Sequence, residues 1–396
     1  MPSPQPPKPT KPKVIVFGIL FFYPLAGVTY QFLHYLLGLR RLGYDVYYIE
    51  DSARYVYDLK LEDFVPDPLP NIRAVAPILD QFGFEGRWAF RGAWAGGECH
   101  GMSEQQIRQL YRDAEAFLNV TGSQEIRDEH MAVPHRIYVE SDPGALQIKV
   151  SLGHESTIAT LDRHTCCFSF GENMGAPDCP LPIERYKWLP TRQPIATDLW
   201  NANHNGDRGT AFNTISTWTN RGNDIEWRGE QYLWSKHLEF PKFIDLPKRR
   251  PDTAFELAAG VDEDIRRTLK DNCWRIADPV AVSRDVEHYR TYIERSRGEF
   301  TVAKDQYIRL RAGWFSDRSA CYLAAGRPVI NQDTAFDKIL PTGKGLFSFR
   351  NMEHVLAAVD EIESDYAGNC AAAREIAHEY FCAEKVVGSL MRRAGL

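Results

Sequence analysis

The sequence lacks closely spaced cysteines of the Cys-x-x-Cys type, and the pairs Cys99-His100 and His164-x-Cys166 stand without a second spaced pair. Structural zinc sites usually draw their four ligands from two such pairs, so we expect no zinc site. Scattered cysteines are typical of reduced core thiols in a cytoplasmic protein. The chain has eight: Cys99, Cys166, Cys167, Cys179, Cys273, Cys321, Cys370 and Cys382.

A long apolar run is also missing. The apolar segment from Val14 to Tyr23 is too short to span a bilayer as a helix, and it follows Lys8, Lys11 and Lys13. Basic residues before a short apolar run are typical of a secretory signal peptide. The alternative is the buried first strand of a parallel sheet, which the segments after it favour. We therefore expect a cytoplasmic protein with no transmembrane segment.

Basic residues are not in excess: the net charge is −6, from 47 Lys and Arg against 53 Asp and Glu. General nucleic-acid binders usually carry a basic surface, so we expect no stable nucleic-acid binding. This balance still allows a local basic pocket. At 396 residues, the chain is long enough for two domains of ordinary size.

The most informative stretch runs from Arg297 to Thr334. Phe300 to Ala303 reads as a buried strand, and a polar loop should follow it. Ser316 is a suitable N-cap for a helix that should end at Gly326. The segment from Arg327 to Ile330 then starts another strand. The predicted order is strand, basic loop, helix, glycine and strand.

Such a unit is suited to bind an anion. The N–H groups at a helix start lack intrahelical partners and mark the positive end of the helix dipole. Arginines can grip two phosphate oxygens at once. The alternative is an ordinary strand–helix–strand unit with a solvated basic loop. The candidate diphosphate-binding residues are Lys304, Arg309, Arg311, Ser316, Asp317, Arg318 and Ser319.

A similar unit opens the chain. Val14 to Gly18 reads as a strand, Val28 to Leu42 as an amphipathic helix that ends at Gly43, and Tyr44 to Glu50 as a strand. The glycines do not have the G-x-G-x-x-G spacing of nicotinamide dinucleotide sites. The candidate N-terminal glycine loop consists of Gly27, Val28 and Thr29.

The two units resemble those of GT-B-fold, nucleotide-sugar-dependent glycosyltransferases, with a donor-binding region similar to that of bacterial family-1 and family-4 enzymes. The resemblance rests on LGYDVYYIE after the first helix, and on the run from Gly313 through AAGRPVI, which ends at Ile330. It implies an α/β protein with two doubly wound Rossmann-like domains facing a central cleft. It also implies that the second unit holds the donor diphosphate and that Gln332, Asp333 and Thr334 contact the donor sugar. The alternative is that these residues, on the loop after a strand, form only a turn.

Two positions depart from that family pattern. Many GT-B families have a ribose-binding glutamate five residues before the helix-ending glycine, where this chain has Cys321. Eight residues further upstream, a His or Glu often meets the phosphate or sugar, and here Gly313 stands. The usual side-chain grip on the donor is therefore not present.

Asp142 and Glu172 are the candidate catalytic acids. Asp142 follows the predicted strand Arg136 to Glu140, at the sheet edge that faces the ligand crevice in open α/β sheets. It could act as a general base toward an acceptor hydroxyl, or cap the helix that begins near Ala145. Glu172 follows another predicted strand and is either a crevice residue or a turn residue. His164, before that strand, is more often structural than catalytic.

The predicted elements divide the chain into four parts: a disordered tail at 1–12, an N-terminal acceptor domain at 13–200, a C-terminal donor domain at 211–380, and a helix at 381–396 that returns to the N-terminal domain. The linker falls at Asn201 to Thr210. In the second domain we expect a strand at Ala211 to Thr217, a helix at Gly229 to Ile244 and another helix at Val286 to Ser296.

The function implied by the resemblance is sugar transfer from a nucleotide diphosphate sugar, a co-substrate rather than a cofactor, to an acceptor, without a metal. Two alternatives remain open: a nucleotide-sugar 2-epimerase of the same fold, and a non-catalytic nucleotide or sugar binder. Arg87 to His100 is a candidate acceptor loop, although Trp88, Phe90 and Trp94 could equally cover the core. The sequence leaves the sugar, nucleotide, acceptor, stereochemical outcome and oligomeric state open.

Overall fold

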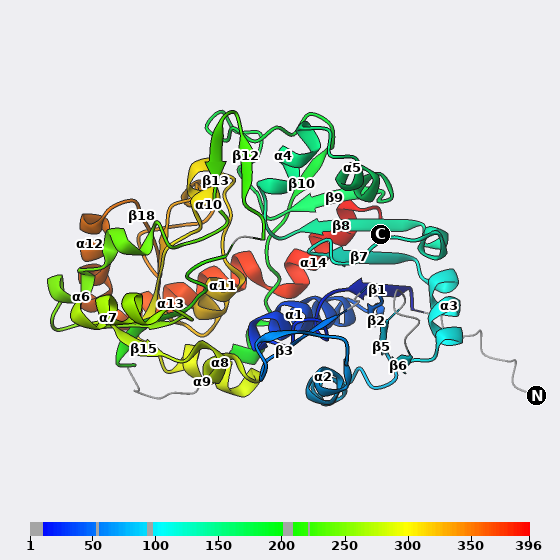
Figure 1. The fold of residues 1–396 in the computed structure, drawn as a ribbon, viewed down its shortest axis with the longest axis horizontal. Helices are drawn as coiled ribbons and strands as arrows, with labels where there is room; N and C mark the ends of the chain where they lie inside the picture. The colour runs from blue at the N-terminus through cyan, green and yellow to red at the C-terminus, as the bar shows by residue number, and fades with distance from the viewer. Residues whose placement is uncertain (1–10, 53–54, 93–97, 201–208, 221) are drawn as a thin grey trace, which may run out of the picture.

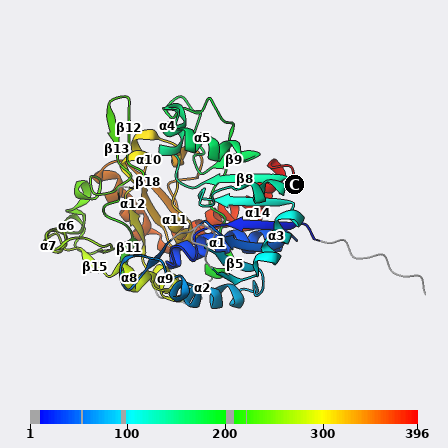
Figure 2. The same ribbon diagram turned by 45° about the vertical axis from the view of Figure 1, so that its right-hand side comes forward.

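The computed structural model describes residues 11–52, 55–92, 98–200, 209–220 and 222–396. They form two α/β halves, each built on its own sheet, which Figures 1 and 2 show from two directions. The expected α/β class with two Rossmann-like sheets is confirmed. Most of the predicted tail at 1–12 and of the predicted linker at 201–210 lies outside the described residues.

The first sheet has eight strands in the order β10-β9-β8-β7-β1-β2-β5-β6, and only β6 runs antiparallel to its neighbour. Its central strand, β1, has β2 on one side and β7 on the other. The strands are β1 (Lys13–Phe17), β2 (Asp45–Glu50), β5 (Trp88–Arg91), β6 (Cys99–Gly101), β7 (Ala116–Val120), β8 (His135–Glu140), β9 (Cys166–Ser169) and β10 (Trp188–Pro190).

Both faces of β1 are buried, which explains its unbroken apolar sequence. Val14 and Val16 pack with residues of α1 (Ala26–Arg41) on one face. Ile15 and Phe17 pack with residues of α3 (Glu104–Asp113) on the other face. Because side chains alternate along a strand, one apolar run serves two helix layers. The remaining helices of this half are α2 (Leu69–Gln81), α4 (Ala145–Ser151) and α5 (Glu155–Asp162).

The second sheet has six parallel strands in the order β15-β14-β11-β16-β17-β18. They are β11 (Ala211–Ile215), β14 (Ala254–Ala258), β15 (Arg275–Ala277), β16 (Gly298–Thr301), β17 (Val329–Gln332) and β18 (Leu346–Phe349). The α-helices of this half are α6 (Leu246–Arg249), α7 (Glu263–Asp271), α8 (Pro279–Ser283), α9 (Val286–Glu294), α10 (Asp305–Leu310), α11 (Asp317–Ala324), α12 (Met352–Ser364) and α13 (Tyr366–Ile376), and α14 (Ala383–Arg393) ends the chain.

The two predicted strand–helix–strand units are confirmed, with shifts of one to two residues at most ends. α1 ends just before Gly43, which has φ +96°, and α11 is followed by Gly326 with φ +68°. Both glycines adopt the left-handed conformation that commonly ends a helix.

The predicted helix from Gly229 to Ile244 is wrong. β12 (Ile225–Trp227) and β13 (Glu230–Tyr232) form an antiparallel hairpin there, followed by a 3₁₀ turn at Phe240–Phe243. Arg228 and Gly229 join the strands with φ of +54° and +77°. Two consecutive residues with positive φ form a tight hairpin turn, and positive φ is incompatible with a right-handed helix.

The predicted polar loop after β16 is also wrong, since α10 occupies most of it. Tyr307 and Leu310 are fully buried on its inner side. Arg311 ends the helix with φ +48°. Burial of two large side chains at i and i+3 favours this short helix over a solvated loop.

The end of the chain packs against its beginning. Leu390 and Met391 of α14 lie in the same core cluster as Leu36 of α1, and the Cβ atom of Ala383 closely approaches Gly38. Figure 1 shows α14 in red beside the blue α1. This contact ties the C-terminal helix to the first half. Among the described residues, no helix is long and apolar enough to cross a membrane.

Candidate functional site

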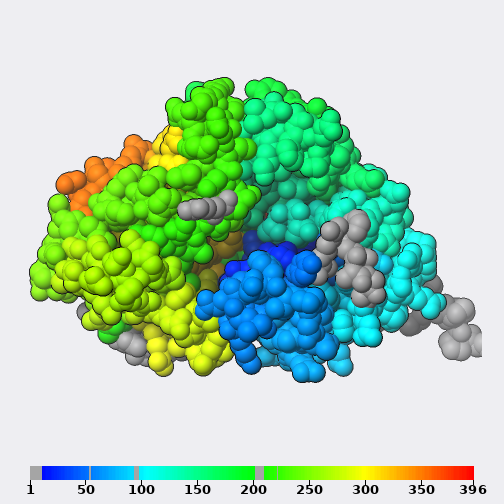
Figure 3. Space-filling model, viewed as in Figure 1, coloured from blue at the N-terminus to red at the C-terminus, as the bar shows by residue number. Residues whose placement is uncertain are grey.

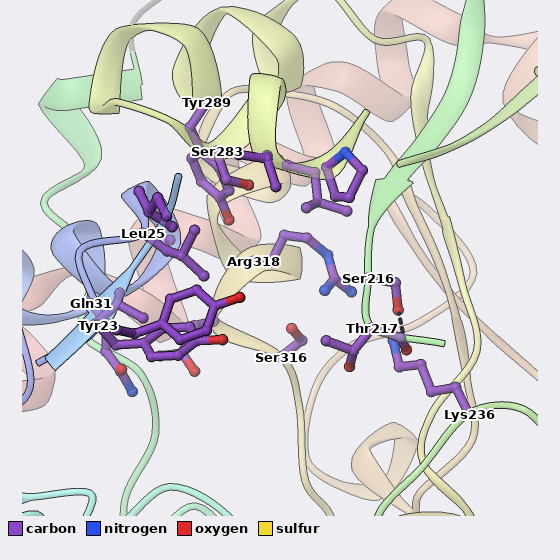
Figure 4. A pocket seen from close by; sticks show the side chains of 18 of the residues that line it. Tyr23, Leu25, Gln31, Ser216, Thr217, Lys236, Ser283, Tyr289, Ser316 and Arg318 are labelled. Atoms are coloured by element: carbon purple, nitrogen blue, oxygen red, sulfur yellow. Dashed lines mark hydrogen bonds between the residues drawn. The ribbon is translucent and has the colours of Figure 1, made fainter. Parts of the chain in front are cut away.

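A cavity of about 420 Å³ lies where the two halves meet. Figure 3 shows the surface hollowed at this junction, and Figure 4 shows many of the lining residues. The first half contributes Tyr23, Leu25, Gly27, Val28, Gln31, Tyr57 and Leu59. The second half contributes Ile215, Ser216, Thr217, Lys236, Pro279, Val280, Ser283, Tyr289, Lys304, Trp314, Ser316, Asp317 and Arg318.

Three cations of the second half lie along this cavity: Lys236, Lys304 and Arg318. Arg318 Nε donates to Glu299 Oε1 at 2.6 Å, and its Nη2 donates to Thr301 Oγ1 at 3.1 Å. Lys236 Nζ donates to the same threonine oxygen at 3.2 Å. Strand β16, which carries Glu299 and Thr301, therefore fixes two of the three positive charges.

Burial makes these charges costly. It lowers the pKa of Lys236 well below its usual value, and the positive charge of Arg318 lowers it further. Burial also lowers the pKa of Lys304 to about 8, although the nearby Asp142 carboxylate opposes the change. An anion in the cavity would relieve the repulsion among these groups, so their arrangement favours binding of a phosphate or diphosphate.

The start of α11 also faces the cavity. Ser316 occupies the N-cap position as predicted, although within the described part of the chain its hydroxyl makes no capping hydrogen bond. Asp317 is the first residue of the helix, and burial raises its pKa to about 7, with the charge of Asp142 adding to the effect. At neutral pH its carboxyl is therefore partly protonated and able to donate a hydrogen bond. Ser319 is buried and does not line the cavity.

Arg309 and Arg311 lie outside the residues that line the cavity. Arg309 pairs with Glu230 and donates to the Gln231 carbonyl on the β12–β13 hairpin. Arg311 Nε donates to Asp178 at 2.9 Å and its Nη1 donates to Asp333 at 3.0 Å. Each arginine thus has carboxylate partners within the protein.

The predicted sugar-contact residues are buried and hydrogen-bonded within the second half. Gln332 Nε2 donates to Glu239 Oε2 at 2.7 Å, and Thr334 Oγ1 donates to the Trp314 carbonyl at 2.5 Å. Asp333 accepts from Arg311 and from Arg350 Nε at 2.7 Å. They follow β17, as predicted, but do not line the cavity.

Asp142 does not cap α4, whose N-cap is Gly144. Its carboxylate instead reaches across to the second half, where it accepts from Tyr307 and from Trp234 Nε1 at 3.1 Å and pairs with Lys304 Nζ at 3.4 Å. Burial favours the neutral form, but the charge of Lys304 and these hydrogen bonds outweigh it, so the pKa of Asp142 is lowered. Asp142 therefore connects the first half to a cation that lines the cavity.

Glu172 is placed elsewhere. Its carboxylate accepts from Arg192 Nη2 at 2.6 Å and does not line the cavity. Burial raises the pKa of Glu172, and the ion pair opposes that change. His164 is partly buried, with Nε2 at 3.2 Å from the Asn119 amide, which is consistent with a structural role.

Gly27 and Val28 line the cavity at the start of α1, while Thr29 is buried and its hydroxyl donates to the Leu25 carbonyl at 3.2 Å. A Cβ atom on Gly27 would lie 3.4 Å from the Tyr289 hydroxyl. The absence of a side chain at Gly27 thus lets α1 approach α9 of the other half closely.

The two departures from the family pattern have structural explanations. Cys321 is buried against α1, with Sγ 4.0 Å from His34 Nε2. Gly313 has φ +81°, and a Cβ atom there would lie 2.8 Å from the backbone nitrogen of Asn173 in the first half. Close packing between the halves therefore explains why a small residue stands at each of these two positions.

Sequence reasoning missed Lys236, Ser216 and Thr217, although all three line the cavity. In Figure 4 the Arg318 guanidinium points toward Ser216, and Lys236 lies on the same side. Ser216 and Thr217 follow β11 directly, so the sheet-edge rule applied to Asp142 would have found them. Lys236 lay inside the wrongly predicted helix and had no comparable signal.

The expected acceptor loop at Arg87 to His100 lies partly outside the described residues, and Trp94 falls in the part that is not described. Trp88 and Phe90 are buried on β5 in the core of the first half. These two residues therefore belong to the core of the first half, the alternative to a role in acceptor binding.

Among the described residues, Asp51, Glu129 and His130 are the one group of three or more side chains of metal-ligand type close enough to share an ion. Arg91 Nη2 lies 2.8 Å from Asp51 and 2.5 Å from Glu129, and Arg127 Nη2 lies 2.7 Å from Asp51. Two guanidinium groups already offset these carboxylates, which is typical of a structural ion-pair network.

The fold resembles solved glycosyltransferase structures over almost the whole chain. An α-glucosyltransferase (AGT) in complex with UDP matches with TM-score 0.55 at 10% identity, over 97% of this chain and 100% of that chain. Anabaena Alr3699/HepE in complex with UDP and glucose matches with TM-score 0.56 at 9% identity, over 98% and 100%. Sucrose-phosphate synthase from Thermosynechococcus elongatus matches with TM-score 0.50 at 12% identity, over 97% and 99%.

No family model matches the sequence, and no curated protein sequence matches it. The structural likeness covers both halves, so the fold is GT-B, as the resemblance of its two strand–helix–strand units implied.

Proposed function

We propose that this protein is a glycosyltransferase that takes its sugar from a UDP-sugar bound in the cavity between the halves. The observation that carries the proposal is the convergence of Lys236, Lys304, Arg318 and the start of α11 on one cavity. UDP is the nucleotide bound in two of the similar structures, the α-glucosyltransferase and HepE.

The diphosphate would lie against the three cations and the first turn of α11. These groups offset the negative charge that develops on UDP as it leaves, a task that a metal ion performs in other enzymes. Pro279 and Val280 of α8, with Tyr289 of α9, form a largely apolar part of the same cavity, suitable for the uracil and ribose. We propose that transfer needs no metal.

Asp142 is the proposed general base. During transfer the acceptor oxygen forms a bond to C1 of the sugar while the bond from C1 to the β-phosphate oxygen breaks. UDP leaves with the electron pair, and the proton of the acceptor passes to Asp142. Asp142 is not itself among the residues that line the cavity, but its 3.4 Å contact with Lys304, which does line it, supports this role. A phosphate that draws Lys304 away would leave the base more basic.

A thermal-shift panel of UDP, dTDP, GDP, ADP and CDP tests the donor site. A ligand at about 100 times its Kd should stabilise the fold by roughly 2.7 kcal/mol. UDP should stand out, and a flat panel would refute the proposal. Incubation with UDP-sugars then distinguishes the three candidate functions. A glycosyltransferase releases UDP, an epimerase forms a new nucleotide sugar without an acceptor, and a binder shows no turnover.

A further inference from the structure

A second cavity, of about 430 Å³, lies in the first half. Gly18 and Ile19 follow β1, Ser123 and Gln124 follow β7, and Glu50 ends β2. Strand β1 lies between β2 and β7. The chain continues from β1 to β2 on one side and later adds β7 on the other side, so the strand order reverses at β1. Ligands of open α/β sheets bind at this kind of switch point, beyond the carboxyl ends of the strands.

A chain of four aromatic rings connects this cavity with the proposed donor cavity. Phe64 and Phe22 line the second cavity, and Tyr57 and Tyr23 line the first. Tyr57 and Phe64 are cross-strand partners in the hairpin of β3 (Val56–Asp58) and β4 (Asp63–Val65), with ring centroids 5.4 Å apart. Tyr23 stacks on Tyr57 at 4.6 Å, and Phe22 lies 5.5 Å from Phe64. A continuous row of aromatic contacts therefore runs from the wall of the second cavity to the wall of the first.

The polar side chains of the second cavity already have protein partners. Both Glu50 oxygens accept backbone N–H groups, at 2.6 Å from Phe22 and 2.9 Å from Phe21. Ser52 accepts from the Glu125 backbone, Ser123 donates to the Val120 carbonyl, and the Gln124 amide donates to Asp51. A sugar would need several uncommitted hydrogen-bonding groups, whereas a flat apolar body needs stacking surface.

That stacking surface is present and accessible. Phe64 and Tyr55, which line the cavity, are 50% and 54% exposed, and Ile19 and Phe22 complete an apolar wall. Rings with both an open face and an aromatic neighbour favour offset stacking with another aromatic group. The wall is thus open to an incoming ring.

We infer that the second cavity is the acceptor site and that the acceptor is a small, flat aromatic alcohol or phenol, held by Phe22, Tyr55 and Phe64 with its hydroxyl toward the donor cavity. The inference rests on the proposed function, since it names the acceptor class of the same enzyme.

Binding of 4-methylumbelliferone, a small fluorescent phenol, tests the inference on the full chain. Its Kd is measured by fluorescence titration with and without UDP, and UDP binding is measured separately by calorimetry. Phe64→Ala should weaken the phenol by about tenfold through loss of stacking, and leave UDP affinity within about twofold. Phe64→Tyr should restore binding. Leu61→Ala is the matched control, because Leu61 is 67% exposed on the same hairpin but lines neither cavity.

The outcomes separate the two proposals. Phenol binding that is sensitive to Phe64 but not to Leu61, in a protein that also binds UDP, supports the acceptor site. UDP binding without phenol binding refutes the acceptor class and leaves the donor proposal standing. Phenol binding without UDP binding refutes the acceptor role, because no donor is then present. Equal losses of phenol affinity in the Phe64 and Leu61 variants would place the phenol on the outer face of the hairpin. Binding of methyl glucoside in place of the phenol would show a sugar site. Either result overturns the inference.

Discussion

Lys236→Met gives the sharpest test of the donor site. Lys236 is 5% exposed, and among the described residues its side chain has one hydrogen-bond partner, Thr301. Thr301 also accepts from Arg318, so the threonine stays paired in the variant. Methionine has nearly the same length and fills the same space. Replacing a buried charge with an apolar group is often neutral or stabilising, so we expect the free energy of unfolding to stay within about 1 kcal/mol of wild type or to rise.

The effect on UDP should be large. A hydrogen bond to a charged group contributes about 1.5–3 kcal/mol, which corresponds to a rise in Kd of roughly 10- to 150-fold. Calorimetric titration with UDP measures this rise, and urea unfolding measures stability. The matched control is Lys248→Met, which removes the same charge from an exposed position on α6. A Kd for UDP that stays within about threefold in both variants would show that the diphosphate does not lie beside Lys236.

Three further outcomes are expected. Because burial raises the pKa of Asp317 from 3.8 to about 7, the folded state holds a proton that the unfolded state has lost. Folding should therefore become less favourable as pH rises through this window, and UDP affinity should also fall as the carboxyl ionises beside the phosphates. Urea unfolding and UDP titration at about pH 5 and about pH 8 measure the two pH dependences, and Asp317→Asn should remove both. A pH dependence that persists in the variant would belong to other groups. Asp142→Asn should lower kcat by about 10²-fold with the donor KM little changed, since the amide cannot accept the proton, and an unchanged kcat would exclude Asp142 as the base. Excess EDTA should leave turnover intact, whereas loss of activity that manganese restores would contradict the proposed metal independence.

Local sequence signals were sufficient for the elements whose pattern agrees with their packing. The apolar run of β1, the stripe of α1 and the glycines after α1 and α11 are each readable from neighbouring residues, and the structure has them within two residues or so. The same signals predict Lys304, Ser316, Asp317 and Arg318 as binding residues, and all four line the cavity. The loop and helix start that follow a parallel strand face the ligand edge of its sheet.

Segments whose structure depends on distant partners were not predictable in this way. The residues of the β12–β13 hairpin are compatible with a helix, and its turn at Arg228 and Gly229 carries only one glycine as a local signal. Helix α10 forms where polar residues indicated a loop, because Tyr307 and Leu310 find a buried environment supplied by other parts of the chain.

The sequence by itself therefore determined the α/β class, the two strand–helix–strand units and the helix start that lines the cavity. Only the tertiary structure decided which of the predicted charged side chains line the cavity and which are paired elsewhere. It pairs Arg309 with Glu230 and Arg311 with Asp178 and Asp333, while it brings Lys236 beside Thr301 and Arg318. The physical reason is that the environment of a charge is set by carboxylates and burial contributed from far along the chain, and local sequence carries no record of those neighbours.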